Sequence, residues 1–351
     1  MKRLCILMLI PLLTSCSFVS LERQIYPICM SVDKTDDGKI QLGIQAPKSG
    51  GSSTDQANYA ILTASGETFD EALRILSAST PYPLHFGQIR LCLIGYPLAS
   101  ALPLRPLLET ILELPTMRPN AYVSISMGNA MGVMQNQQPD LGMRLSTHLS
   151  LMITRMQREQ LLPDSMLSYC VRELSDGRSD LLIGVSAVNP RLVPQETSQP
   201  PKGSSESTPA AAMGEPWTDA LVPENLIAGL IPHNSDNPVE YLGSAVVSNG
   251  AVTGVLTADQ TQLCLRLLDE AKRKVARDGE ALQLQIHLPK DSPLSQSTGA
   301  VSSLMETLQT LRSDPLLFGC IASGAFLTEE AWQAYDFRHR YPEADVWIGV
   351  E

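Results

Sequence analysis

The chain has 351 residues, 44% of them hydrophobic, which excludes wholesale disorder and leaves room for two or three domains. Lys and Arg number 26 against 37 Asp and Glu, and the resulting net charge of -11 argues against a nucleic-acid-binding role. Aromatic residues make up only 5%, so a surface for stacking bases or sugars is not expected either.

The N-terminus has the pattern of a lipoprotein signal peptide. Lys2 and Arg3 precede an apolar run over residues 4–13, which is too short to cross a bilayer as a permanent helix. The run ends in Leu-Thr-Ser-Cys, an aliphatic residue and two small ones before Cys16. An ordinary secretory signal with an incidental cysteine is the alternative, but the order of the three features favours cleavage after residue 15 and lipidation of Cys16. Acyl chains such as palmitate would then hold the chain on the membrane.

Strand-like and helix-like spacings of apolar residues alternate along the chain. The expected strands cover residues 24–32, 40–45, 59–64, 89–95, 121–127, 181–189, 241–247, 251–256, 282–288 and 345–350. The expected helices cover residues 69–76, 98–114 (interrupted at Pro103 and Pro106), 149–160, 165–174, 259–277, 302–311 and 327–339. The Asp37–Gly38 and Asn249–Gly250 pairs are typical of hairpin turns. We therefore predict an α/β (mixed α+β) fold of several small domains, each a mostly antiparallel or mixed sheet packed with helices.

Composition changes suggest where these domains begin and end. Residues 194–216 are rich in Pro, Ser, Gln and Glu without periodicity, which is typical of a flexible linker. The predicted division is a signal peptide (1–15), an N-terminal α/β domain (16–193), the linker (194–216), a middle region with the Asn-Gly hairpin (217–290) and a C-terminal α/β domain (291–351).

The acidic turn that begins at Asp33 invites comparison with a calcium-binding loop. Such a loop needs oxygen ligands at alternating positions and a carboxylate at the twelfth position. Here Thr35 stands at the third position and Ile44 at the twelfth, so a hairpin turn is the better interpretation.

The sequence holds no motif that points to catalysis or to a cofactor. It lacks a nucleotide-binding glycine fingerprint, a G-x-S-x-G elbow and an H-E-x-x-H zinc motif. Ser65 could be a nucleophile, but capping of the helix that begins near Thr68 is the simpler interpretation. Cys92 and His85 could form a thiol–imidazole pair, but Cys92 lies in an apolar strand. We therefore expect no enzymatic activity, no catalytic residues, no cofactor and no metal.

Short segments in order along the chain resemble the Ger(x)C family, the lipoprotein subunits of spore germinant receptors. The segments that carry the resemblance are 22–25, 31–39, 64–76, 86–99, 118–123, 243–256 and the positions Asp314, Gly319, Trp332, Tyr341 and Val346. The chain departs from the family pattern at Gln88, where the family has histidine, and at Tyr96, where it has glutamate. No segment is specific alone, and the ordered set together with Cys16 makes the resemblance.

The resemblance implies a lipid-anchored C subunit of a nutrient germinant receptor, without catalytic activity. Its implied partners are the integral-membrane A and B type receptor subunits, besides membrane lipid through Cys16. Its implied location is the outer face of the spore inner (cytoplasmic) membrane, and its role lies in germination after sporulation. Two other classes stay open: a solute-binding lipoprotein of a transport system, and a tethered envelope hydrolase. The first needs two similar lobes and the second a nucleophile–base pair, and the sequence displays neither.

Overall fold

A computed structural model describes residues 23–48, 59–139, 143–193, 226–231, 237–278 and 281–351. The predicted signal peptide (1–15), Cys16 and the predicted linker (194–216) lie outside the described residues. Within the described ranges, no helix combines the length and the apolar character that crossing a membrane requires.

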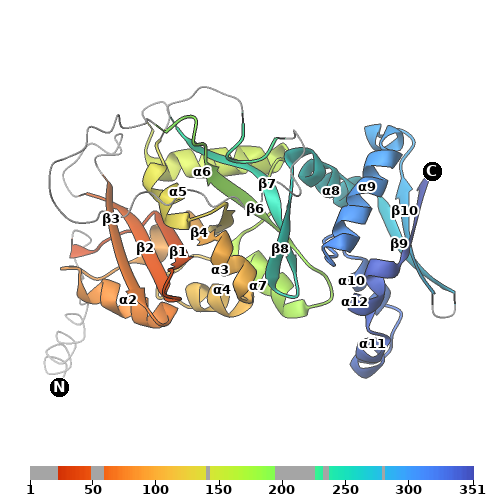
Figure 1. The fold of residues 1–351 in the computed structure, drawn as a ribbon, viewed down its shortest axis with the longest axis horizontal. Helices are drawn as coiled ribbons and strands as arrows, with labels where there is room; N and C mark the ends of the chain where they lie inside the picture. The colour runs from red at the N-terminus through yellow and green to blue at the C-terminus, as the bar shows by residue number, and fades with distance from the viewer. Residues whose placement is uncertain (1–22, 49–58, 140–142, 194–225, 232–236, 279–280) are drawn as a thin grey trace, which may run out of the picture.

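A mixed eight-stranded sheet organises the larger part of the molecule, called here the first unit (Figure 1). Its strands, in spatial order, are β3 (Tyr59–Gly66), β2 (Ile40–Pro47), β1 (Cys29–Lys34), β4 (Leu91–Gly95), β5 (Tyr122–Ser126), β6 (Leu182–Val188), β7 (Val239–Ser248) and β8 (Ala251–Leu256). Strands β1, β4, β5 and β6 run parallel to one another, and the outer pairs are antiparallel. The predicted 24–32 and 40–45 strands thus form the expected hairpin, with register Lys34↔Ile40.

Helices cover the central strands on both faces, since every residue of β4 and β5 is buried. The helices of this unit are α2 (Phe69–Ala78), α3 (Tyr96–Ala101), α4 (Leu104–Leu112), α5 (Ala130–Asn136), α6 (Leu145–Arg158) and α7 (Leu167–Asp176), besides the short η3 (Phe86–Gln88). The break between α3 and α4 falls at Pro103, as predicted, but the interruption predicted at Pro106 is wrong, because Pro106 lies in the first turn of α4, where proline is tolerated. Helix α5 lies outside every predicted element.

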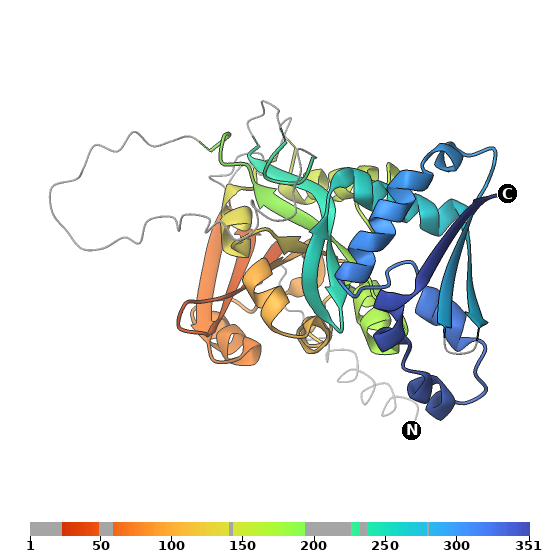
Figure 2. The same ribbon diagram turned by 45° about the vertical axis from the view of Figure 1, so that its right-hand side comes forward.

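The second unit is a three-stranded sheet with its own helices (Figure 2). Its elements are α8 (Ala258–Glu270), β9 (Lys272–Asp278), β10 (Ala281–Leu288), η5 (Pro293–Gln296), α9 (Thr298–Thr310), α10 (Phe318–Ser323), α11 (Glu329–Tyr335), α12 (Phe337–Arg340), η6 (Tyr341–Glu343) and β11 (Asp345–Val350). Strand β10 lies in the centre, antiparallel to β9 and parallel to β11. Together the two sheets confirm the predicted mixed α/β fold.

Two predicted helices of the second unit are divided in the structure. The expected 259–277 helix ends at Glu270, and Lys272–Asp278 form β9, because the exposed Lys272 and Lys274 alternate with partly buried residues at strand spacing. The expected 327–339 helix is split at Asp336, whose φ of 49° is left-handed and ends α11.

Sheet membership differs from the predicted division of the chain. The β7–β8 hairpin turns at Asn249 and Gly250, both with positive φ, as expected. It does not belong to a separate middle region, however, because β7 pairs with β6 and completes the first sheet. Strands β9 and β10 belong to the second sheet, so the predicted 217–290 region is shared between the units.

Candidate functional site

The loops between the two units carry the sequence positions Asp314 and Gly319 that the family resemblance singled out. Residues 177–182 lead into β6 of the first sheet, and residues 311–319 connect α9 to α10 in the second unit. We call these two segments together with Arg338 the joint. The core of the second unit extends across it, since Leu182, Val246 and Leu256 of the first sheet pack within that core.

Asp180 and Asp314 bind each other's backbone across the joint. The Asp180 backbone N–H donates to the Asp314 carbonyl oxygen (3.1 Å), and the Asp314 N–H donates to Oδ2 of Asp180 (3.0 Å). The Asp314 side chain in turn accepts from the N–H groups of Phe318 (3.1 Å) and Gly319 (2.6 Å) at the start of α10. One carboxylate therefore fixes the other unit's loop, and the second fixes the helix that follows.

Arg338 closes the joint from α12. Its Nη1 lies 2.9 Å from Oδ1 of Asp180, and its Nη2 donates to the carbonyl oxygen of Gly177 (3.1 Å). The Asp180 side chain is only 4% exposed, so the guanidinium group supplies the counter-charge that a buried carboxylate requires.

The Asp314 carboxyl is fully buried, and burial raises its pKa to about 8. The two backbone N–H groups and Arg338 act in the opposite direction, because they favour the charged form. The proton on Asp314 is therefore poised near neutral pH, at the contact between the two units.

Gly319 lets the two units approach each other closely. A Cβ atom on this residue would lie 1.9 Å from the carbonyl oxygen of Arg178 in the first unit. Gly319 stood out in the sequence only through the family resemblance, and the structure shows that the residue it must accommodate belongs to the other unit.

A groove of about 470 Å³ runs beside the joint and has walls from both units. Gln160 and Asp269, one from each unit, are joined across it by a hydrogen bond of 2.6 Å. The remaining walls come from the end of α6, the 162–169 and 180–182 segments, α8 and the 315–317 segment. Contacts on both sides of the groove tie its shape to the relative position of the units.

The structure shows where the two candidate nucleophiles weighed from the sequence lie. Cys92 is fully buried in β4, where burial raises the pKa of its thiol to about 12, so the reactive thiolate does not form at neutral pH. Ser65 pairs with Gln41 inside β3, and Thr68 instead caps α2 by accepting from the N–H of Glu71. The expectation that Ser65 is the cap is therefore wrong by three residues.

The acidic turn also has a structural role. Asp33 accepts hydrogen bonds of 2.8 Å from the N–H groups of Ala130 and Met131 and so holds the first turn of α5 against β1. Gly95 leaves room for this carboxylate, since a Cβ there would lie 2.2 Å from its Oδ1. Across the described ranges, no three His, Cys, Asp or Glu side chains are arranged to hold a metal ion.

Comparison with known proteins finds a family match for most of the larger unit. Residues 17–187 match the family model described as the spore germination protein N-terminal domain. Through these residues the chain contains a spore germination protein N-terminal domain. The resemblance to the Ger(x)C family is thereby confirmed.

The matched residues end within β6, next to the joint. A solved structure titled "Crystal Structure of the GerBC protein" is 13% identical to the chain, with a TM-score of 0.48, covering 92% of this chain and 95% of that one. No curated protein matches the sequence.

Proposed function

We propose that the chain is the C subunit of a nutrient germinant receptor, anchored to the membrane through Cys16 and acting through protein–protein contacts rather than catalysis. The observation that carries the proposal is the spore germination protein domain over residues 17–187. The lipobox-like sequence at Cys16 supplies the anchor in this proposal. The proposed partners are integral-membrane A and B type receptor subunits, on the outer face of the spore inner membrane.

The architecture supports an interaction role. The core of the second unit includes residues of the first sheet, so a partner that displaces one unit also moves the other. The alternative, a solute-binding lipoprotein, is expected to have two similar lobes around a hinge. The two units instead differ in size and topology, with eight and three strands.

Spores that lack the gene test this proposal. They should germinate slowly with nutrients but normally with pressure or detergent, which bypass receptors. Complementation with Cys16→Ala should restore little response and leave the protein outside the membrane fraction, because acyl transfer requires the thiol. A deletion strain without a redundant paralogue that responds normally to every nutrient tested would contradict the receptor role.

A further inference from the structure

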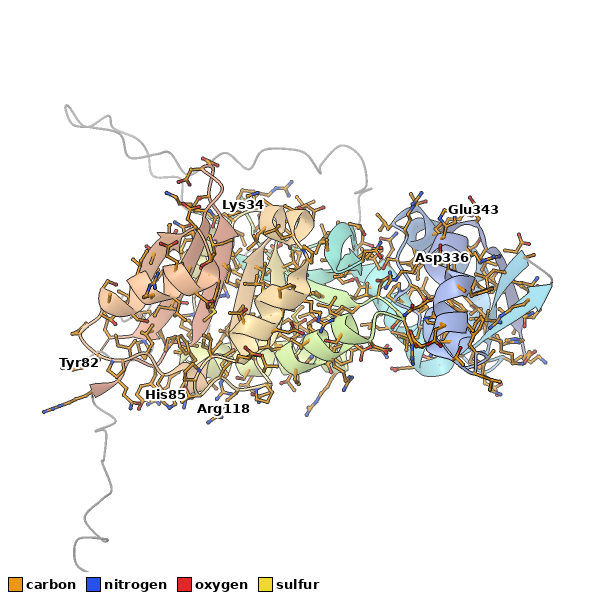
Figure 3. All side chains as sticks on the ribbon, turned by 90° about the horizontal axis from the view of Figure 1, so that it is seen from below. Lys34, Tyr82, His85, Arg118, Asp336 and Glu343 are labelled. Carbon is orange, nitrogen blue, oxygen red and sulfur yellow. The ribbon has the colours of Figure 1, made fainter. Side chains whose placement is uncertain are left out.

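One end of the first sheet, where β1, β4 and β5 begin, is built from three adjoining loops. They are residues 23–28, 81–90 and 115–120, and together we call them the basic rim. The first two loops are joined by hydrogen bonds from Ile25 N–H to the Pro83 oxygen (3.0 Å) and from His85 N–H to the Ile25 oxygen (2.8 Å). The third adjoins them at Gly87, where a Cβ would lie 3.2 Å from the Thr116 oxygen. Figure 3 shows Tyr82, His85 and Arg118 along one edge of the molecule and Lys34 at the opposite edge.

The basic rim carries positive charge, whereas the protein as a whole is negatively charged. Its loops contain Arg23, Arg90 and Arg118 but neither Asp nor Glu, in a chain of net charge -11. Even with the flanking Glu22 and Glu113 the balance stays positive. Among the described residues, none of these three guanidinium groups has a carboxylate within ion-pair distance.

The opposite end of the sheet has the opposite charge. The turns at 34–39 and 66–71 hold five carboxylates, Asp36, Asp37, Glu67, Asp70 and Glu71, against Lys34 and Lys39. The two ends of the first sheet therefore carry opposite charge: the end where β1 begins is basic, and the end where β1 ends is acidic.

An exposed aromatic side chain projects from the basic rim. Tyr82 is 44% exposed and stands between the exposed Pro81 and Pro83. Tyrosine is enriched where protein meets the boundary between lipid and water, because its ring is apolar and its hydroxyl is polar.

The proposed anchor lies next to the basic rim along the chain. Only six residues separate Cys16 from Arg23, and the seven peptide steps between them extend over at most about 25 Å. We propose that the basic rim rests on anionic lipid headgroups beside the anchor, with Arg23, Arg90 and Arg118 facing phosphate and Tyr82 at the headgroup level. This orientation rests on the proposed anchoring at Cys16. It directs the acidic end of the sheet away from the membrane, whose negative surface would repel the carboxylates.

Vesicle binding by a chain that starts at Ser17 tests the proposal without the lipid. Such a chain keeps every described residue, so its fold is retained. Phosphatidylcholine vesicles with and without phosphatidylglycerol are the probes, and co-sedimentation is the measurement. The chain should bind the anionic vesicles, and bind them less as salt is raised. Arg23→Gln with Arg118→Gln should weaken this binding about 25-fold, because each basic residue near an anionic surface contributes about a fivefold preference.

Lys34→Gln with Lys39→Gln is the matched control, since it removes the same charge from the acidic end and should leave binding unchanged. Equal losses in both double variants, equal binding to neutral vesicles, or no binding by the parent chain would each overturn the proposal. If the parent chain ignores anionic vesicles and the rim variant loses co-purification with integral-membrane proteins, the rim is a protein contact instead. Lipidation of Cys16 is assayed separately on the full chain, so failure of the anchor and failure of the rim are distinguishable.

Discussion

Replacing Gly319 by Ala tests whether the two units really meet at the joint as closely as the structure indicates. The new Cβ would lie 1.9 Å from the backbone oxygen of Arg178, so α10 or the 177–182 loop must move by about 1.5 Å to restore an ordinary contact. A backbone oxygen cannot swing aside as a side chain can. The displacement also stretches the 2.6 Å hydrogen bond from the Gly319 N–H to Asp314.

Two effects of opposite sign set the magnitude. Overpacking against rigid backbone costs about 3 kcal/mol, at the upper end of the usual range. Alanine in a helix gains about 1 kcal/mol over glycine, which leaves a net loss of about 2 kcal/mol. Gly299→Ala is the matched control, because Gly299 is likewise the second residue of its helix but an added Cβ meets nothing within 4 Å.

Equilibrium denaturation of the chain from Ser17, followed by far-UV circular dichroism, provides the measurement. The free energy of unfolding should fall by about 2 kcal/mol in Gly319→Ala and rise by up to about 1 kcal/mol in Gly299→Ala. If both variants are equally stable, the close approach of Arg178 to α10 is wrong.

Three further predictions concern the joint and the linker. Arg338→Gln leaves the buried Asp180 without its counter-charge and should lower the free energy of unfolding by about 3 kcal/mol in a denaturation experiment. The control Arg178→Gln breaks only exposed ion pairs and should lower it by less than about 1 kcal/mol. Similar losses in the two variants would contradict this role of Arg338. Because the pKa of Asp314 is raised to about 8, the folded chain holds a proton that the unfolded chain releases near pH 4. The free energy of unfolding should therefore fall as the pH rises from about 5 to 8, and Asp314→Asn should lose this component; an unchanged slope would refute it. Excising residues 194–216, which contain a single Met and no larger apolar side chain, should leave the unfolding transition cooperative, and loss of cooperativity in calorimetry would show that this segment packs on a unit.

Periodicity predicted most of the elements that have strong local patterns. The β1–β2 and β7–β8 hairpins combine alternating apolar residues with Asp-Gly and Asn-Gly turns, so their sequence alone specifies them. Helix α5 was missed because its Ala, Met and Val side chains are mostly buried and show no polar face, and because its first turn is held by Asp33 from a strand far earlier in the chain.

The joint could be predicted only in part. Asp314 and Gly319 stood out through the family resemblance, but nothing local connects Asp314 with Asp180, 134 residues earlier. Pairing at such separations depends on how the sheets pack, which a single sequence does not reveal. The sharing of the 217–290 region between two sheets was missed for the same reason. The edge of β6 pairs with β7, which follows the linker in the sequence.

Affinity purification of the full-length tagged chain from detergent-solubilised spore membranes tests the central claim, that the protein is a receptor subunit. The account predicts that two integral-membrane subunits of the A and B type co-purify with the wild-type chain, and that Cys16→Ala reduces their recovery. Co-purification with a permease and an ATPase instead, or recovery of the lipidated chain alone, would contradict the receptor assignment.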